Sequence, residues 1–138
     1  MPGRAVAEMT HDQTAAITRA KYVLLTTFKR DGSAVPTPVW AAEDGGALLI
    51  WTPRNSGKVK RLRNSGVVTV APCSMRGKPT GAAVEATAAL LDDAGTAQVQ
   101  EAIGRKYGWI GRTLVNRAAR RGGTHASIGI RVELAPTA

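Results

Sequence analysis

A short basic segment holds the most chemically capable residues of this chain. It reads Ser56-Gly57-Lys58-Val59-Lys60-Arg61, after the apolar run 47–51 and a polar turn. Lys58, Lys60 and Arg61 bring three positive charges to a point where the pattern predicts the start of a helix. The first turn of a helix leaves backbone N–H groups unpaired, and these groups point toward any anion placed there. The segment therefore predicts a phosphate-binding site, with a solvated basic helix as the simpler alternative.

The first residues of this segment have predicted parts in such a site. Asn55 or Ser56 can cap the helix, and Gly57 lets a ligand approach the backbone closely. The glycine spacing does not match the P-loop of nucleotide hydrolases, because no Gly-rich loop precedes the lysine. The choice between a phosphate site and an exposed basic helix therefore depends on the rest of the chain.

A second candidate is the predicted strand 34–42, which contains Pro36 and Pro38. Proline has no N–H, so it belongs at strand edges or bulges. Both prolines fall on one face of the pleat, so backbone on that side is free of pairing and can face a ligand. A plain edge strand explains this pattern equally well.

Composition limits the partners that this chain can have. The 138 residues carry a net charge of +9, which favours an anionic partner. Aromatic residues make up only 4%, which argues against a base-stacking platform for nucleic acid. One cysteine, Cys73, and two histidines, His11 and His125, exclude an internal disulfide and argue against a zinc site. We find no membrane span and no signal peptide, so we expect a cytoplasmic protein.

Hydrophobic patterning predicts a mainly β domain. The predicted strands are 21–28, 34–42, 47–52, 67–73, 80–91 and 126–134. The predicted helices are 10–20, 56–64, 94–107 and 112–121. Because strands and helices do not alternate, we expect an antiparallel or mixed barrel and not a doubly wound parallel sheet. Residues 1–9 are expected to form a loose N-terminus and residues 10–138 a single domain.

Four segments resemble one family in their order along the chain. They are KYVLLTTFKRDGSAVPTPVW, LLIWTPRNSGKVKRLRNSGVVTVAPC, RGKPTGAAVEATAALL and KYGW. They look like the flavin and deazaflavin oxidoreductases with a split β-barrel, the superfamily of pyridoxamine 5′-phosphate oxidase. The resemblance is strongest to the actinobacterial branch that uses the deazaflavin coenzyme F420. It extends over residues 15–134, nearly the whole chain.

The resemblance implies a homodimer of six-stranded Greek-key split barrels with peripheral helices, and a cofactor in grooves at the dimer interface. It implies that the segment 56–61 binds the cofactor phosphate and that strand 35–39 lies against the flavin-like ring through its backbone. The cofactor-binding residues expected from the resemblance and from the charge are Val35, Pro36, Thr37, Pro38, Val39, Trp51, Thr52, Ser56, Gly57, Lys58, Lys60, Arg61, Arg76, Thr80 and Gly81.

The activity expected from this resemblance is hydride transfer between reduced F420 and an unsaturated or conjugated small molecule. F420 carries a phosphodiester and a tail of several glutamates, which suits the positive charge of the chain. The residues that could hold the tail are Arg76, Lys78, Arg112, Arg117, Arg120 and Arg121, and a solvated basic face is the simpler alternative for the last four. An FMN-dependent oxidase or reductase of the same fold, and a non-catalytic F420 carrier, remain alternatives. Tyr107 and His125 are candidate proton donors by residue type only, so no catalytic residue is assigned.

Overall fold

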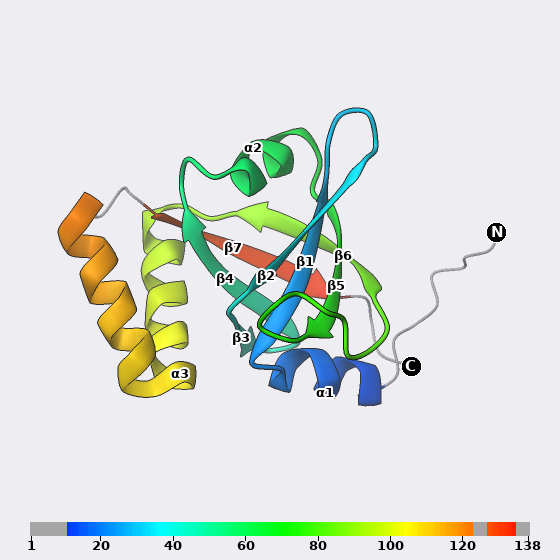
Figure 1. Cartoon of the computed structure of the whole chain (residues 1–138). Helices are drawn as coiled ribbons and strands as arrows, with labels where there is room; N and C mark the ends of the chain where they lie inside the picture. The colour runs from blue at the N-terminus through cyan, green and yellow to red at the C-terminus, as the bar shows by residue number, and fades with distance from the viewer. Residues whose placement is uncertain (1–10, 123–126, 135–138) are drawn as a thin grey trace.

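The computed structural model describes residues 11–122 and 127–134, which form one curled antiparallel sheet with three helices around it (Figure 1). The strands are β1 (Tyr22–Phe28), β2 (Ala34–Val39), β3 (Ala41–Asp44), β4 (Ala47–Pro53), β5 (Val67–Cys73), β6 (Val84–Leu90) and β7 (Ser127–Leu134). The helices are α1 (His11–Arg19), α2 (Gly57–Asn64) and α3 (Asp93–Gly122). None of the described helices has an apolar stretch that could cross a bilayer. The predicted mainly β fold class is confirmed.

The strand order explains why the sheet curls. The order is β2-β1-β5-β6-β7-β4-β3, and the part from β4 to β5 is a Greek key. The two edge strands, β2 and β3, are consecutive in the chain and are separated only by Trp40. Two peptide links span at most about 7 Å. The two edges of the sheet must therefore meet at this end, which bends the sheet into a barrel that is open where β2 and β3 do not pair.

The predicted strand 34–42 is thus two strands, and the sheet has seven strands where six were expected. β2 pairs with β1, whereas β3 pairs with β4. Between them the ring of Trp40 stacks on Tyr107, with centroids 4.2 Å apart and planes 6° from parallel. The sequence could not reveal this change of partner, because the hydrophobic pattern continues through Trp40.

Two other predicted boundaries differ from the structure. The strand expected at 80–91 begins only at Val84, because residues 80–83 turn across the end of β5, where the Thr80 N–H donates to the Pro72 carbonyl at 2.8 Å. The break predicted between the last two helices is confirmed inside α3. Gly108 there has φ 65° and ψ −146°, a backbone conformation that favours glycine.

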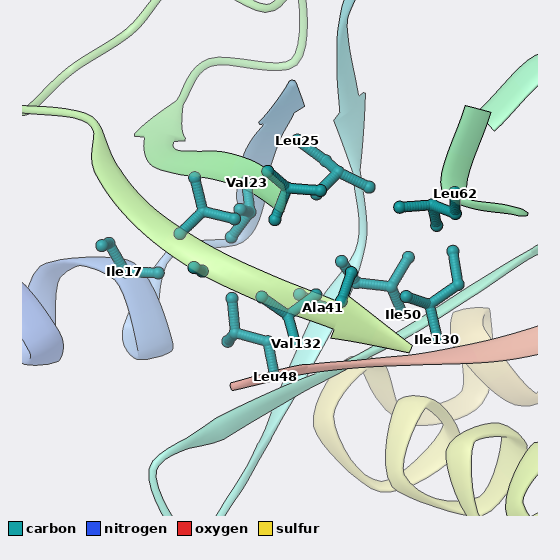
Figure 2. Packing of buried hydrophobic residues seen from close by; sticks show 13 residues of the cluster. Ile17, Val23, Leu25, Ala41, Leu48, Ile50, Leu62, Ile130 and Val132 are labelled. Atoms are coloured by element: carbon teal, nitrogen blue, oxygen red, sulfur yellow. The ribbon is translucent and has the colours of Figure 1, made fainter. Parts of the chain in front are cut away.

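Inward-facing side chains fill the barrel. Figure 2 shows Leu25 of β1, Leu48 and Ile50 of β4, and Ile130 of β7 in this core. Leu62 of α2 closes one end of this core, and Ile17 of α1 closes the other (Figures 1 and 2). A second buried cluster lies outside the barrel, where α3 packs on β3 and β4. This second layer explains why residues 47–50 of β4 are buried on both faces.

Lys106 and Tyr107 fasten α3 to the barrel. The Lys106 Nζ donates to the carbonyls of Thr18, Ala20 and Ala41 at 3.3, 2.8 and 2.6 Å. The Tyr107 hydroxyl donates to the Lys21 carbonyl at 2.7 Å and accepts from the Ala41 N–H at 3.1 Å. Burial lowers the pKa of Lys106 and raises the pKa of Tyr107 to about 12. Tyr107 is therefore held as a neutral phenol in the scaffold.

We expect the phenol of Tyr107 to be visible in an alkaline titration. An absorbance titration of the native protein should contain an ionisation near pH 12, and Tyr107→Phe should lack it. A phenol pKa raised above the unfolded value stabilises the fold fully below about pH 10, and this stabilisation is lost as the pH rises through about 12. Tyr107→Phe should lower the free energy of unfolding at pH 8 by about 1 kcal/mol. Tyr22→Phe is the control, and a step near pH 12 that survives in Tyr107→Phe would contradict the assignment.

Candidate functional site

The start of α2 is open to an anion. Ser56 occupies the N-cap position with φ −72° and ψ 159°, but its side chain makes no capping hydrogen bond. The first turn of α2 contains no acidic residue. The side chain of Ser56 therefore accepts no hydrogen bond from the free N–H groups of this turn. These groups and the positive end of the helix dipole can face a ligand. The predicted helix and its N-cap position are confirmed, although Ser56 does not cap in the usual way.

Two cations flank this first turn. The Arg61 side chain folds back along the helix, and its Nε donates to the Thr27 hydroxyl at 2.6 Å. A Cβ added at Gly57 would lie 2.7 Å from Nη1 of Arg61. Gly57 therefore makes room for the guanidinium, whereas the sequence had suggested room for the ligand itself. Arg61 is thus brought from the middle of the helix to its N-terminal end.

Lys58 is the second cation, and it is half-buried. Burial, and then the positive charge of Arg61, lower the pKa of Lys58. Lys58 makes no hydrogen bond or ion pair with any residue that the structure describes. A bound anion would oppose both causes of the pKa shift, because it would supply a counter-charge to the two cations at once. The electrostatics of this pair therefore favour an anionic ligand.

Buried polar atoms without partners lie next to these cations in the sequence. The Thr52 hydroxyl and the Ser56 hydroxyl have no hydrogen-bond partner within the described residues, and neither has Nε1 of Trp51. Leaving a buried hydroxyl unsatisfied costs about 1–3 kcal/mol. Ser56 begins α2, so its hydroxyl lies beside the first turn of the helix, whereas Thr52 faces the inside of the barrel. The Ser56 hydroxyl therefore suits the phosphate of a cofactor.

The proline strand forms an edge of the sheet, as its composition predicted. Pro36 pairs with Thr26, and Pro38 pairs with Leu24. Because proline lacks an N–H, it suits the pair positions whose backbone groups point away from the partner strand. The free edge of β2 then presents the carbonyls of Pro36 and Pro38 but no N–H group between residues 35 and 39. Such an edge suits a ligand that donates hydrogen bonds, and it resists pairing with another strand.

The remaining predicted residues lie at the other end of the barrel. Arg76, Thr80 and Gly81 are exposed and belong to the segment 74–83 that follows β5. The length of β5 places this segment about 20 Å from the C-terminal end of α2. A Cβ added at Gly77 would lie 3.5 Å from the Pro38 ring, so the segment covers one end of β2. Within one chain, Arg76 is therefore far from Lys58 and Arg61.

Some predicted cofactor-binding residues that are close in the sequence point in different directions in the structure. Trp51 packs toward α3, whereas Thr52, which is 3% exposed, turns to the inside of the barrel. Lys60 is exposed and lies about 200° around the helix from Lys58. The structure thus places Ser56, Lys58 and Arg61 around the start of α2, with Thr52 inside the barrel and Lys60 and Trp51 on other faces.

Two residues that position this site could not be recognised from the sequence. Thr27 holds the guanidinium of Arg61, and Arg54 donates to the Ser127 carbonyl at 3.2 Å, which fixes the turn before α2. The inward alternation of β1 marks Thr27 as buried, but no sequence signal links it to Arg61. Among the described residues, no group of three or more His, Cys, Asp or Glu side chains could hold a metal ion. His125 and the side chains of Arg120 and Arg121 lie outside the described part.

The free hydroxyl of Thr52 leads to a stability prediction. Thr52→Val should raise the free energy of unfolding of the ligand-free protein by about 1 kcal/mol, because it replaces an unsatisfied hydroxyl with a methyl group of similar size. Thr27→Val should lower it by about 1–2 kcal/mol, because the guanidinium of Arg61 loses its acceptor. Urea denaturation measures both. Equal destabilisation by the two substitutions would show that the Thr52 hydroxyl already has a partner.

Comparison with known proteins gives the family of this chain. A sequence model described as pyridoxamine 5′-phosphate oxidase matches residues 9–135. No curated protein matches the sequence. A conserved hypothetical protein from Mycobacterium tuberculosis shares the fold, with a TM-score of 0.67 and 18% identity over 95% of this chain and 84% of that chain.

Two further structures share the fold. An F420 reductase has a TM-score of 0.54 and 16% identity over 90% of this chain and 93% of its own. HutZ, a heme storage protein from Vibrio cholerae, has a TM-score of 0.65 and 12% identity over 92% of this chain and 90% of its own. Since the family match extends over nearly the whole chain and the curled sheet agrees with it, this chain belongs to the pyridoxamine 5′-phosphate oxidase family, with its flavin-binding split β-barrel.

Proposed function

We propose that this protein is an F420-dependent oxidoreductase that transfers a hydride between reduced deazaflavin and an unsaturated or conjugated small molecule. The observation that carries the proposal is the start of α2, where Lys58 and Arg61 flank free N–H groups and the unpartnered hydroxyl of Ser56. This arrangement suits a phosphodiester. The net charge of +9 favours F420 over FMN, because the glutamate tail of F420 adds further negative charges.

The chain binds and orients the cofactor in this proposal. Lys58, Arg61 and the first turn of α2 hold the phosphodiester, while Thr27 keeps the guanidinium in place. The carbonyls of Pro36 and Pro38 accept hydrogen bonds from the ring. When bound, reduced F420 supplies the hydride. The segment 74–83 covers the end of β2 and helps to exclude water from the ring.

We also propose that the protein acts as a homodimer. α3 packs on β3, β4 and β7, whereas α2 contacts β1 and α1 contacts β5 at the ends of the barrel. The half-buried side chains on the outer face of β1 and β5 can then take a partner. That face contains Thr26 paired with Thr69, and Val67 at its end is 56% exposed. A second copy of this chain can cover it and can bring its own segment 74–83 toward the site, which would place a second Arg76 near the cofactor.

A charge at the centre of this face should separate the subunits. Thr69→Arg should convert a dimer to a monomer in sedimentation or light-scattering measurements, because two like charges would meet across the two-fold axis. Gln98→Arg on the exposed side of α3 adds the same charge elsewhere and should leave the mass unchanged. A monomeric native protein, or a dimeric Thr69→Arg variant, would argue against this interface.

Lys58 should contribute strongly to cofactor affinity. Lys58→Ala should weaken F420 binding by about 1–3 kcal/mol, because it removes a charge-assisted hydrogen bond to the phosphodiester. Lys60→Ala removes an equal charge from another face of the helix and should have a much smaller effect. Fluorescence titration measures both dissociation constants. Equal losses in the two variants would show that the effect is one of net charge only.

The cofactor itself is tested by titrating the native protein with F420 and with FMN. Selective binding of F420, followed by turnover of a conjugated acceptor, supports the proposed oxidoreductase. Selective binding of FMN indicates an FMN-dependent enzyme of the same fold. Tight binding of F420 without turnover of any acceptor indicates a carrier protein, and binding of neither cofactor contradicts all three.

A further inference from the structure

The kink at Gly108 divides α3 into two parts with different surroundings. The first part, residues 93–107, packs on the barrel through the second buried cluster. The second part, residues 109–122, lies on the outer side of the first part, away from the sheet (Figure 1). A Cβ added at Gly104 would lie 3.1 Å from Cγ of Arg112, so the two parts are in contact. The second part therefore folds back on the first as one arm of a helical hairpin.

The second part exposes two large apolar side chains directly after the kink. Trp109 is 77% exposed and Ile110 is 48% exposed. The other two tryptophans of the chain are partly covered, because Trp40 stacks on Tyr107 and Trp51 packs in the second buried cluster. Tryptophan is enriched where an apolar surface meets water, as in the interfacial belts of membrane proteins. The tip of the hairpin is therefore suited to contact with a partner that has an apolar interior.

Positive charge accompanies these apolar side chains. Residues 109–122 contain four arginines and no acidic residue, whereas residues 93–107 contain two basic and two acidic residues. Arg112 and Arg117 are exposed, and neither forms an ion pair with any residue that the structure describes. The charge of the second part is therefore available to an anion outside the chain.

The apolar and the cationic side chains share one side of this helix. At about 3.6 residues per turn, Trp109, Thr113 and Arg117 lie within about 80° of one another around the axis. Ile110 lies about 20° beyond Arg117, and Arg112 lies about 60° to the other side of Trp109. All five residues are exposed, so together they form one outward surface.

We propose that this surface, formed by Trp109, Ile110, Arg112, Thr113 and Arg117, docks on a bilayer that contains anionic lipids. Tryptophan and isoleucine enter the boundary between headgroups and acyl chains, while the arginines bind the headgroup phosphates. The lack of acidic residues in the segment complements the negative potential of such a bilayer. A nucleic acid would attract the same arginines, but the exposed isoleucine beside the tryptophan favours lipid.

The docking surface is separate from the other surfaces proposed for this chain. The candidate phosphate site lies at the start of α2, and the proposed dimer face lies on β1 and β5, whereas α3 packs on β3, β4 and β7. The docking surface shares no residue with either of them, and it does not rest on the proposed function. It gives Arg112 and Arg117 a role other than holding the tail of a cofactor.

Sedimentation with lipid vesicles tests the docking surface. The native protein should bind vesicles of equimolar phosphatidylcholine and phosphatidylglycerol at least about tenfold more tightly than vesicles of phosphatidylcholine alone, and salt should weaken the binding. Binding should also shift the tryptophan fluorescence to shorter wavelength, because Trp109 is the most exposed of the three tryptophans and would leave water.

Two variants and one control separate this surface from the net charge. Arg112→Gln combined with Arg117→Gln should weaken binding to the anionic vesicles about tenfold. Trp109→Ser should weaken it by a similar factor and remove the wavelength shift. Lys29→Gln combined with Arg30→Gln removes the same charge from the hairpin between β1 and β2 and should leave the binding unchanged. All the substituted side chains are exposed, and urea denaturation checks that each variant is folded.

Three outcomes would overturn the docking surface. The first is a native protein that does not bind the anionic vesicles. The second is an equal loss of binding in the Lys29/Arg30 and Arg112/Arg117 variants, which would show that net charge alone attracts the protein. The third is unchanged vesicle binding by Trp109→Ser together with equal affinity for a short DNA duplex, which would indicate a general polyanion surface. The vesicle measurements need no cofactor, so the failure of the cofactor titration would not change their result.

Discussion

The short link between β2 and β3 constrains the whole molecule. Trp40 alone joins the two edges of the sheet, so those edges must meet at that end and the sheet must close around its core. The stacking of Trp40 on Tyr107 holds the link against α3, and the three carbonyl contacts of Lys106 tie the same place to α1. The closure of the barrel and the free edge of β2 both depend on this link.

The candidate site contains charged and polar groups that have no partner within the described part of the chain. Two neighbouring cations share the first turn of α2, and the nearby hydroxyls of Thr52 and Ser56 are buried without partners. Each feature lowers the stability of the ligand-free protein. In the proposed function, a phosphate at the start of α2 would stabilise the two cations and give the Ser56 hydroxyl a partner, so free energy withheld from folding would become available for binding. The hydrogen bond from Arg61 to Thr27 holds the guanidinium in place in the ligand-free protein.

The positively charged side chains of this protein have different roles in the structure. Lys58 and Arg61 converge on one turn, Arg30 is held by Asn64 at the end of α2, and Arg54 serves as a structural link between β4 and β7. Lys106 caps the carbonyls at the end of α1. An excess of positive charge in the composition therefore does not mean that every cation recognises the same partner. What the net charge implies about a ligand depends on which cations lack a partner within the fold.

Local patterns in the sequence determined most of the elements of this protein. Strand alternation, the Asp31-Gly32 turn, the edge prolines and the start of α2 depend on near neighbours, so they could be predicted. The change of partner at Trp40, the hydrogen bond from Arg61 to Thr27 and the position of Arg76 at the opposite end of β5 from α2 could not. These features join residues that are distant in the chain, and a single sequence carries no record of such contacts. Only the tertiary structure decided which of the predicted site residues stand together, because closure of the barrel sets their neighbours.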